Sequence, residues 1–154
     1  MAIERLAELA YARRNTQALL AEGGVEVGRG HYPLIVVLHG AWLAAIVLTV
    51  PPEATVSWPL IAVFAILQGL RGWVLASLGR YWTTRIITVP GAPLVRRGPY
   101  RYVSHPNYLV VAAEIAVLPL AFGAWVIAVI FSALNAAVLA WRISVESKAL
   151  AARR

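Results

Sequence analysis

The chain has 154 residues, of which 60% are hydrophobic and 14% charged, and its mean hydropathy is +0.71. A soluble domain of this size is nearer half apolar and a quarter charged, so the composition predicts one membrane domain. The net charge of +7 could suggest nucleic acid. The basic residues instead gather at the ends of apolar runs, as in membrane proteins, so no nucleic-acid partner is expected. The absence of cysteine excludes disulfides and thiol chemistry.

The N-terminal residues 2–22 are good helix formers, with apolar residues at the amphipathic positions Ile3, Leu6, Leu9 and Ala10. This segment is too charged to span a bilayer. We expect it to lie in the membrane interface or to be the inner end of a longer helix. Two glycines then end it, and residues 25–30 are predicted to be a loop.

Four apolar segments are predicted to be transmembrane helices. The first two lie within residues 33–78, at 33–50 and 58–78, and each is long enough to cross a hydrocarbon core of about 30 Å. The last two, 106–122 and 124–143, are joined so closely that they should form an antiparallel hairpin. The predicted fold is therefore an all-α membrane helix bundle, with about four transmembrane helices and an N-terminal partial or interfacial helix.

The arrangement in the membrane follows from the distribution of Lys and Arg. The loops 51–57 and 121–125 contain neither residue, whereas the N-terminal segment, the loop 79–105 and the tail contain nearly all of them. The latter group should be cytosolic, in a multi-pass protein of the cell inner membrane. We divide the single domain 1–154 into an N-terminal amphipathic segment 1–32, two transmembrane helices within 33–78, the cytosolic loop 79–105 and a helical hairpin 106–147.

The stretch from Arg96 to Tyr108 is the densest run of charged, aromatic and hydrogen-bonding residues in the chain. Gly98 and Pro99 mark a turn, and Pro106 suits the first turn of a helix. His105 and Asn107 should therefore lie at the N-terminal mouth of the next helix. Free N–H groups at such a mouth favour an anionic group, such as a carboxylate.

Polar residues within the apolar helices form two stripes. One contains Ser132, Asn135, Arg142 and Glu146, and the other contains Asn107 and Glu114. Ionisable groups at membrane depth need a partner or a water-filled cavity, so both stripes should face inward, toward the loop with His105.

Simpler interpretations of these residues remain open. Arg142 and Glu146 could be an ion pair that ends the helix, and Arg71 could snorkel or pair with Glu114. His39 is alone on an apolar helix, which favours a packed, hydrogen-bonded role. The basic loop could serve only to set the membrane topology and to bind lipid phosphate. The histidines are too scattered for a zinc signature, so no metal is expected.

The run GPYRYVSHPNY, then an apolar hairpin, then Arg142-x-x-x-Glu146 resembles the integral-membrane isoprenylcysteine carboxyl methyltransferase family and its phospholipid-methylating relatives. The resemblance covers roughly residues 58–150. It implies that S-adenosylmethionine (SAM) binds in a cytosolic pocket closed by the connecting loop, and that Arg142 orients the substrate as the catalytic residue. Asn135, Glu114 and His39 are further substrate-binding candidates. The implied cofactor-binding residues are Leu94, Val95, Tyr100, His105, Pro106, Asn107, Tyr108 and Glu146.

A closer resemblance covers nearly the whole chain. The runs ARRN, EVGRGHY, SLGRYWTTRIITVPGAPLVRRGPYR and RISVESKAL resemble the small bacterial methyltransferases that are encoded beside type III polyketide synthases. Those enzymes O-methylate alkylpyrones and related phenolic lipids. The chain departs from the family at Ser104, where Arg is usual, and at Ser147, where a second Glu is usual. Its first membrane helix is also shorter, which leaves open a homodimer in which a neighbouring subunit covers the lipid-facing wall.

These observations predict a SAM-dependent O-methyltransferase for a lipophilic, anionic acceptor from the bilayer, either an alkylpyrone or alkylresorcinol lipid or an isoprenylcysteine carboxylate. A sterol-type membrane reductase that binds NADPH is one alternative. Those enzymes typically follow the His-Pro-Asn-Tyr tyrosine with Gly and an acidic residue, whereas Leu109 and Val110 follow here. A non-enzymatic lipid-binding membrane protein is the other alternative.

Overall fold

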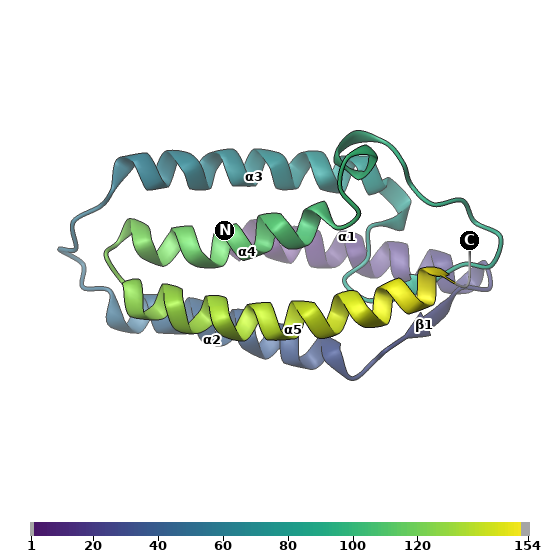
Figure 1. Cartoon of the computed structure of the whole chain (residues 1–154), viewed down its shortest axis with the longest axis horizontal. Helices are drawn as coiled ribbons and strands as arrows, with labels where there is room; N and C mark the ends of the chain where they lie inside the picture. The colour runs from purple at the N-terminus through teal and green to yellow at the C-terminus, as the bar shows by residue number, and fades with distance from the viewer. Residues whose placement is uncertain (1, 152–154) are drawn as a thin grey trace.

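The computed structural model describes residues 2–151, except for the side chains of residues 2, 3 and 31. Helices α2 to α5 run side by side along the long axis, and α1 lies along one half of this bundle (Figure 1). The described residues confirm the predicted all-α fold. The helices are α1 Ala2–Ala21, α2 His31–Thr49, α3 Trp58–Leu78, α4 Pro106–Ala121 and α5 Trp125–Ala151, with short 3-10 turns η1 Gly79–Tyr81 and η2 Gly98–Arg101.

Within the described part of the chain, three helices are long and apolar enough to cross a membrane, namely those covering Tyr32–Thr49, Trp58–Tyr81 and Trp125–Ala151. The helix α4 is also apolar but has only 16 residues. It packs between α3 and α5, and α2 packs on α5, so the contacts run in the order α3, α4, α5, α2. The long loop between α3 and α4 and the C-terminal end of α5 lie at one end of the bundle, and the tight α4–α5 turn lies at the other (Figure 1).

The helix boundaries follow from the local sequence. Proline occupies the first turn of α3 and of α4, where its missing N–H has no helical partner to lose. Gly123, with φ of 71°, makes the turn from α4 to α5 in a backbone conformation that other residues rarely adopt. The helix α5 continues to Ala151, beyond the predicted end near residue 143, because its last turns are built from residues that favour helix.

The packed face of α1 differs from the apolar positions in its sequence. Leu6 and Leu9 are 67% and 37% exposed, and Ala10 is exposed as well. The side chain of Ile3 lies outside the described part of the chain. The buried or half-buried face instead follows a spacing of three and four residues, through Arg5, Glu8, Ala12, Asn15 and Leu19. Polar residues can occupy this face because each has a hydrogen-bonding partner on another element. The sequence pattern of the helix does not reveal these partners.

Residues 25–30, predicted to be a loop, contain a strand. The strand β1, Val25–Val27, pairs antiparallel with β2, Ile86–Thr88, and Glu26 lies opposite Ile87. The β-branched residues of both segments suit an extended pairing. This small sheet ties the N-terminal part of the chain to the loop between α3 and α4.

The described residues of the bundle form two clusters of buried apolar side chains. One, in the middle of the bundle, contains Trp42, Ile46, Val111 and Ile115, and the indole N–H of Trp42 donates to the Ile115 carbonyl at 3.2 Å. The other, under the loop, joins Ala12, Val74 and Trp82.

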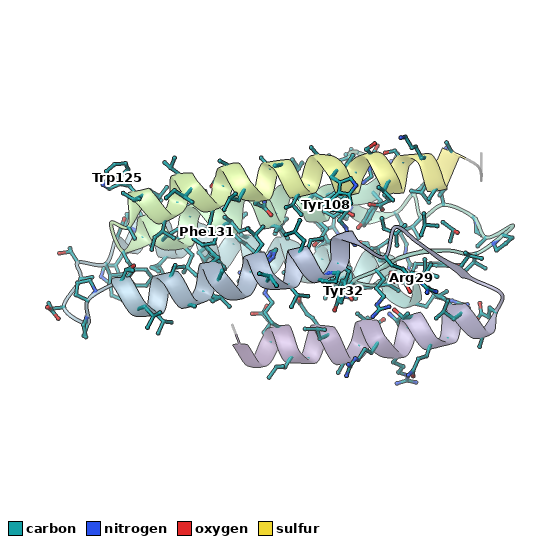
Figure 2. The ribbon with its side chains drawn as sticks, turned by 90° about the horizontal axis from the view of Figure 1, so that it is seen from below. Arg29, Tyr32, Tyr108, Trp125 and Phe131 are labelled. Atoms are coloured by element: carbon teal, nitrogen blue, oxygen red, sulfur yellow. The ribbon has the colours of Figure 1, made fainter. Side chains whose placement is uncertain are left out.

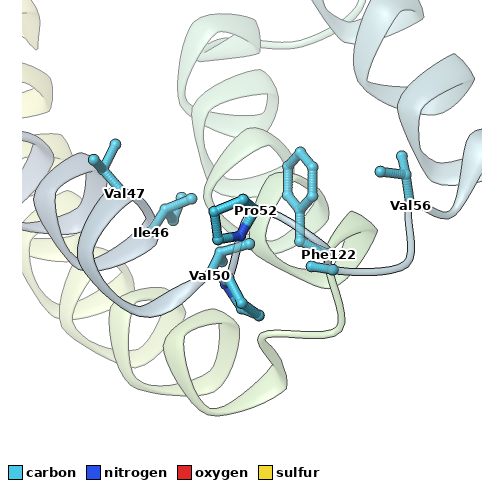
Figure 3. A pocket seen from close by; sticks show the side chains of 8 residues that line it. Ile46, Val47, Val50, Pro52, Val56 and Phe122 are labelled. Atoms are coloured by element: carbon cyan, nitrogen blue, oxygen red, sulfur yellow. The ribbon is translucent and has the colours of Figure 1, made fainter.

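A hollow of about 270 Å³ lies at the end of the bundle with the α4–α5 turn (Figure 3). All the side chains that line it are apolar, so it has no groups for acid–base or charge chemistry. They belong to Ile46, Val47, Val50, Pro51, Pro52, Ala54, Val56 and Phe122.

Candidate active site

A larger cavity, of about 840 Å³, lies at the opposite end, between the first turn of α4, the last turns of α5 and the loop. Its volume is in the usual range for small-molecule sites. Unlike the apolar hollow, it is lined by many polar side chains. The polar and charged residues on its wall are Tyr81, Trp82, Thr83, Arg85, Arg96, Tyr100, Arg101, Ser104, His105, Asn107, Tyr108, Arg142, Glu146 and Ser147.

The hydroxyl of Tyr108 connects α4 to α5 in this cavity. The Nε of Arg142 donates to the Tyr108 hydroxyl at 2.7 Å, and the hydroxyl donates to the Glu146 carboxylate. The Arg142 guanidinium also lies over the Tyr108 ring, 5.6 Å from its centroid. Its Nη2 donates to the backbone carbonyl of Thr84 at 2.9 Å. Arg142 is thus fixed from two sides by groups distant in sequence.

His105 completes what we call the site cluster: His105, Tyr108, Arg142 and Glu146. Its ring stacks on Tyr108 with centroids 5.4 Å apart, and its Nδ1 lies 3.7 Å from the Glu146 carboxylate. That separation is too long for a direct hydrogen bond but short enough for attraction when the imidazole is protonated. Figure 2 shows Tyr108 at the same end of the bundle as Arg29 and Tyr32, far from Trp125.

The first turn of α4 leaves hydrogen-bonding groups available. No side chain among the described residues caps this helix end. The Oδ1 atom of Asn107 is buried and has no hydrogen-bond partner among the described residues. A buried acceptor without a partner is costly, so such a group at a cavity wall is suited to a ligand donor.

Tyr100 borders the same cavity from η2. Burial raises the pKa of its hydroxyl, and the Glu146 carboxylate raises it further. The phenol therefore stays neutral across physiological pH, and it can donate a hydrogen bond or pack against a flat ring.

Comparisons with known proteins identify the family of the chain. The model of the isoprenylcysteine carboxyl methyltransferase family matches residues 60–152. The chain belongs to this family. It is thus a membrane methyltransferase, and its family uses SAM as methyl donor.

Two curated bacterial proteins are similar over nearly the whole chain. The uncharacterized protein YpbQ of Bacillus subtilis is 43% identical over 152 residues, which cover 96% of this chain and 90% of that protein. An uncharacterized protein of Haemophilus influenzae is 25% identical over 151 residues, which cover 95% of this chain and 88% of that protein. No solved structure matches significantly.

Most of the site residues that the family resemblance implies line one cavity. They are Leu94, Val95, Tyr100, His105, Asn107, Tyr108, Arg142 and Glu146. Pro106 is buried at the start of α4 and is not part of the wall. Arg142 and Glu146 are joined through the Tyr108 hydroxyl, and among the described residues they form no direct ion pair.

The three further substrate-binding candidates lie away from the cavity wall. The Nδ1–H of His39 donates to the Ile35 carbonyl within its own helix at 2.9 Å, as the packed interpretation predicts. Asn135 is buried in the bundle, roughly two turns before Arg142 on α5. Glu114 is also buried, because its helix face points toward α1 and α3 at that depth.

Glu114 belongs to a second group of polar residues, the buried charge cluster: Arg5, Glu8, Gln68, Arg71 and Glu114. Glu114 accepts hydrogen bonds from Arg5 at 2.6 Å and Gln68 at 3.0 Å, and its carboxylate lies 3.5 Å from Arg71. Arg71 donates twice to Glu8, both times at 2.7 Å. This confirms the pairing of Arg71 with Glu114 and identifies a closer partner, Glu8, that sequence spacing did not indicate.

Thr84 and Trp82 are among the contributors to the site that were missed in the sequence. Thr84 acts through its backbone carbonyl, and a carbonyl leaves no signature in the residue type. Trp82 lines the cavity although it is 5% exposed. Its position inside the run SLGRYWTTR, which the family resemblance includes, is the one sequence signal that could have identified it.

Proposed function

We propose that the protein is a SAM-dependent O-methyltransferase that acts on a lipophilic acceptor with an anionic oxygen, at the cytosolic face of the membrane. One observation supports this most strongly: the Tyr108 hydroxyl connects Arg142 to Glu146 at the wall of a polar cavity. A cation for an anionic acceptor and a carboxylate for a polar cofactor are thereby held a fixed distance apart.

The cavity residues fit SAM, which supplies a methyl group on a sulfonium when bound. Glu146 and the unpaired Asn107 Oδ1 can accept hydrogen bonds from an ammonium group or ribose hydroxyls. The uncapped first turn of α4, after Pro106, and nearby arginines suit the carboxylate. Tyr100, Leu94 and Val95 offer apolar surface for the adenine.

Arg142 would hold the acceptor oxygen. Its Nε and Nη2 bond to protein, and its Nη1 has no hydrogen-bond partner among the described residues. A guanidinium gives planar, directional donors that suit a carboxylate or an acidic enolate. Such an acceptor is already ionised at neutral pH, so the protein needs to align it rather than deprotonate it.

Two acceptor classes fit this chemistry: alkylpyrone or alkylresorcinol lipids, and isoprenylcysteine carboxylates. The closer sequence resemblance to methyltransferases encoded beside polyketide synthases favours the first. The exposed apolar surface of α2, α3 and α5 would let the tail approach laterally from the bilayer.

Calorimetry and methyl transfer test the proposal. The purified protein in detergent should bind SAM and not NADPH. Radiolabelled methyl from SAM should pass to an alkylpyrone or alkylresorcinol in preference to N-acetyl-S-farnesylcysteine. Binding of NADPH without SAM would favour a reductase, and binding of neither, with no transfer, would leave a lipid-binding role.

The sidedness is tested separately. The chain has no native cysteine, so single cysteines can be introduced cleanly at Ala92 in the loop and at Glu53 at the other end. An impermeant thiol reagent added to the periplasmic side should label the Glu53 position and not the Ala92 position. The opposite labelling would reverse the proposed topology.

A further inference from the structure

We propose that Asn15 on α1 is a positioning residue for this site, which acts on Arg142 through the backbone of residues 79–84. The inference rests on the proposed methyltransferase function. Asn15 precedes the region that the family model matches, and it is the last residue of the ARRN run.

Asn15 holds both ends of one turn. It is 7% exposed, and its Nδ2 donates to the carbonyl of Gly79 at 3.1 Å and to that of Trp82 at 2.9 Å. The Trp82 N–H closes the same turn onto Gly79 at 3.0 Å. The amide uses both of its hydrogens in these bonds, so it fixes where the chain leaves η1.

The residues beside this contact belong to the cavity wall. Ala12, one turn before Asn15, is fully buried and packs in the cluster with Trp82. Trp82 and Tyr100, which packs on that cluster, both line the cavity. A shift of the Asn15 amide would therefore move the part of the wall that Trp82 forms.

The connection to Arg142 is short. The carbonyl of Thr84, which accepts from Arg142 Nη2, is two peptide units after the carbonyl of Trp82. Peptide units are planar, so few dihedral angles lie between the two carbonyls. Loss of the Asn15 bonds should let the Thr84 carbonyl drift and misalign the guanidinium. A displacement of about 1 Å can cost a hundredfold in rate when it misplaces reacting groups.

The same segment is also held further along the chain, so loss of Asn15 should loosen it rather than unfold it. Strand β2 pairs with β1, and Arg85 bonds to Glu26 at 3.1 Å. The guanidinium of Arg85 also lies over the Tyr32 ring, 5.1 Å from its centroid.

The test compares Asn15→Asp, which keeps the shape but removes the donor, and Asn15→Ala with the control Trp42→Phe. The control deletes another buried hydrogen bond to a backbone carbonyl, outside the cavity. We expect both Asn15 variants to lower kcat/KM for the alkylpyrone about tenfold, with SAM affinity changed less than threefold. Amide hydrogen exchange in residues 79–88 should quicken in the Asn15 variants only.

The decisive measurement is the double variant with Arg142→Ala. If Asn15 acts through Arg142, adding Asn15→Ala to Arg142→Ala should lower kcat/KM by less than twofold further, because coupled residues are not additive. Additive losses of kcat/KM in the double variant would overturn this inference. So would a kcat/KM per folded protein in the Asn15 variants that equals that of Trp42→Phe. Either outcome would leave the wild-type activity intact. A wild-type protein that neither binds SAM nor transfers methyl would instead overturn the proposed function.

Discussion

The site cluster and the buried charge cluster are built from the same kinds of groups, namely arginine, carboxylate and a neutral hydrogen-bonding side chain. The two clusters differ in how far their side chains are shielded from solvent. The side chains of Arg71 and Glu114 are 9% and 3% exposed, and Glu114, on α4, has partners from α1 and α3. The side chains of His105 and Glu146 are 21% and 25% exposed, at the wall of the cavity.

This difference separates a structural role from a functional one. In the buried charge cluster, two arginines face two carboxylates, so the charges cancel within the protein. The buried charge cluster therefore has no net charge that would attract a charged ligand. In the site cluster, the single Glu146 carboxylate interacts with Tyr108 and His105, and the cluster keeps groups available to the cavity.

The largest effect, on stability, should come from removing one charge of the buried charge cluster. Glu114→Gln leaves Arg5 and Arg71 with one carboxylate between them, and removing one partner of a buried pair costs about 3–5 kcal/mol. We expect a lower melting temperature and unchanged SAM affinity in the protein that remains folded. The control is Glu53→Gln, which makes the same change at an exposed loop position and should leave stability unchanged. A stable Glu114→Gln protein with impaired acceptor turnover would place Glu114 in the site after all.

Arg142→Ala should have the next largest effect. A charge-assisted hydrogen bond to the acceptor is worth about 1.5–3 kcal/mol, so its loss should lower kcat/KM for the acceptor by roughly ten- to a hundredfold. Arg142→Lys keeps the charge without the planar fork and should recover only part of the rate. Both variants should bind SAM nearly normally in calorimetry, whereas Glu146→Ala should not. Normal turnover by a folded Arg142→Ala protein would contradict the assignment.

Tyr108→Phe should have the smallest effect, because it removes one hydroxyl and keeps the ring. The net worth of a hydrogen bond is about 0.5–1.5 kcal/mol, which corresponds to roughly two- to tenfold in a binding constant. We expect this change to weaken SAM binding and acceptor turnover together, since the hydroxyl connects Glu146 to Arg142. A loss confined to either one would show that the two residues act independently.

The sequence predicted the bundle because each helix carries its own signal in length, apolar content and end residues. It also predicted part of the cavity wall, because the His105–Tyr108 corner and the Arg142–Glu146 pair lie in local runs. It could not place Glu114. The spacing of Glu114 from Asn107 shows that both residues lie on one face of the helix, but it does not show which element packs against that face. The partner Arg5 lies 109 residues earlier, and no local pattern connects the two. Asn15 and the Thr84 carbonyl were missed for the same reason.

The shortness of α4 determines how deep the polar site lies. At 1.5 Å per residue, the 16 residues of α4 are about 24 Å long, whereas a hydrocarbon core is about 30 Å thick. If the turn to α5 is at one boundary of the core, the other end of α4 stops about 6 Å short of the opposite one. Tyr108 then lies below the level of the lipid headgroups, in the outer part of the acyl region. The headgroup of a lipid acceptor could then reach the methyl donor without moving into water. The water-soluble donor would instead have to enter the protein to the depth of the acyl region.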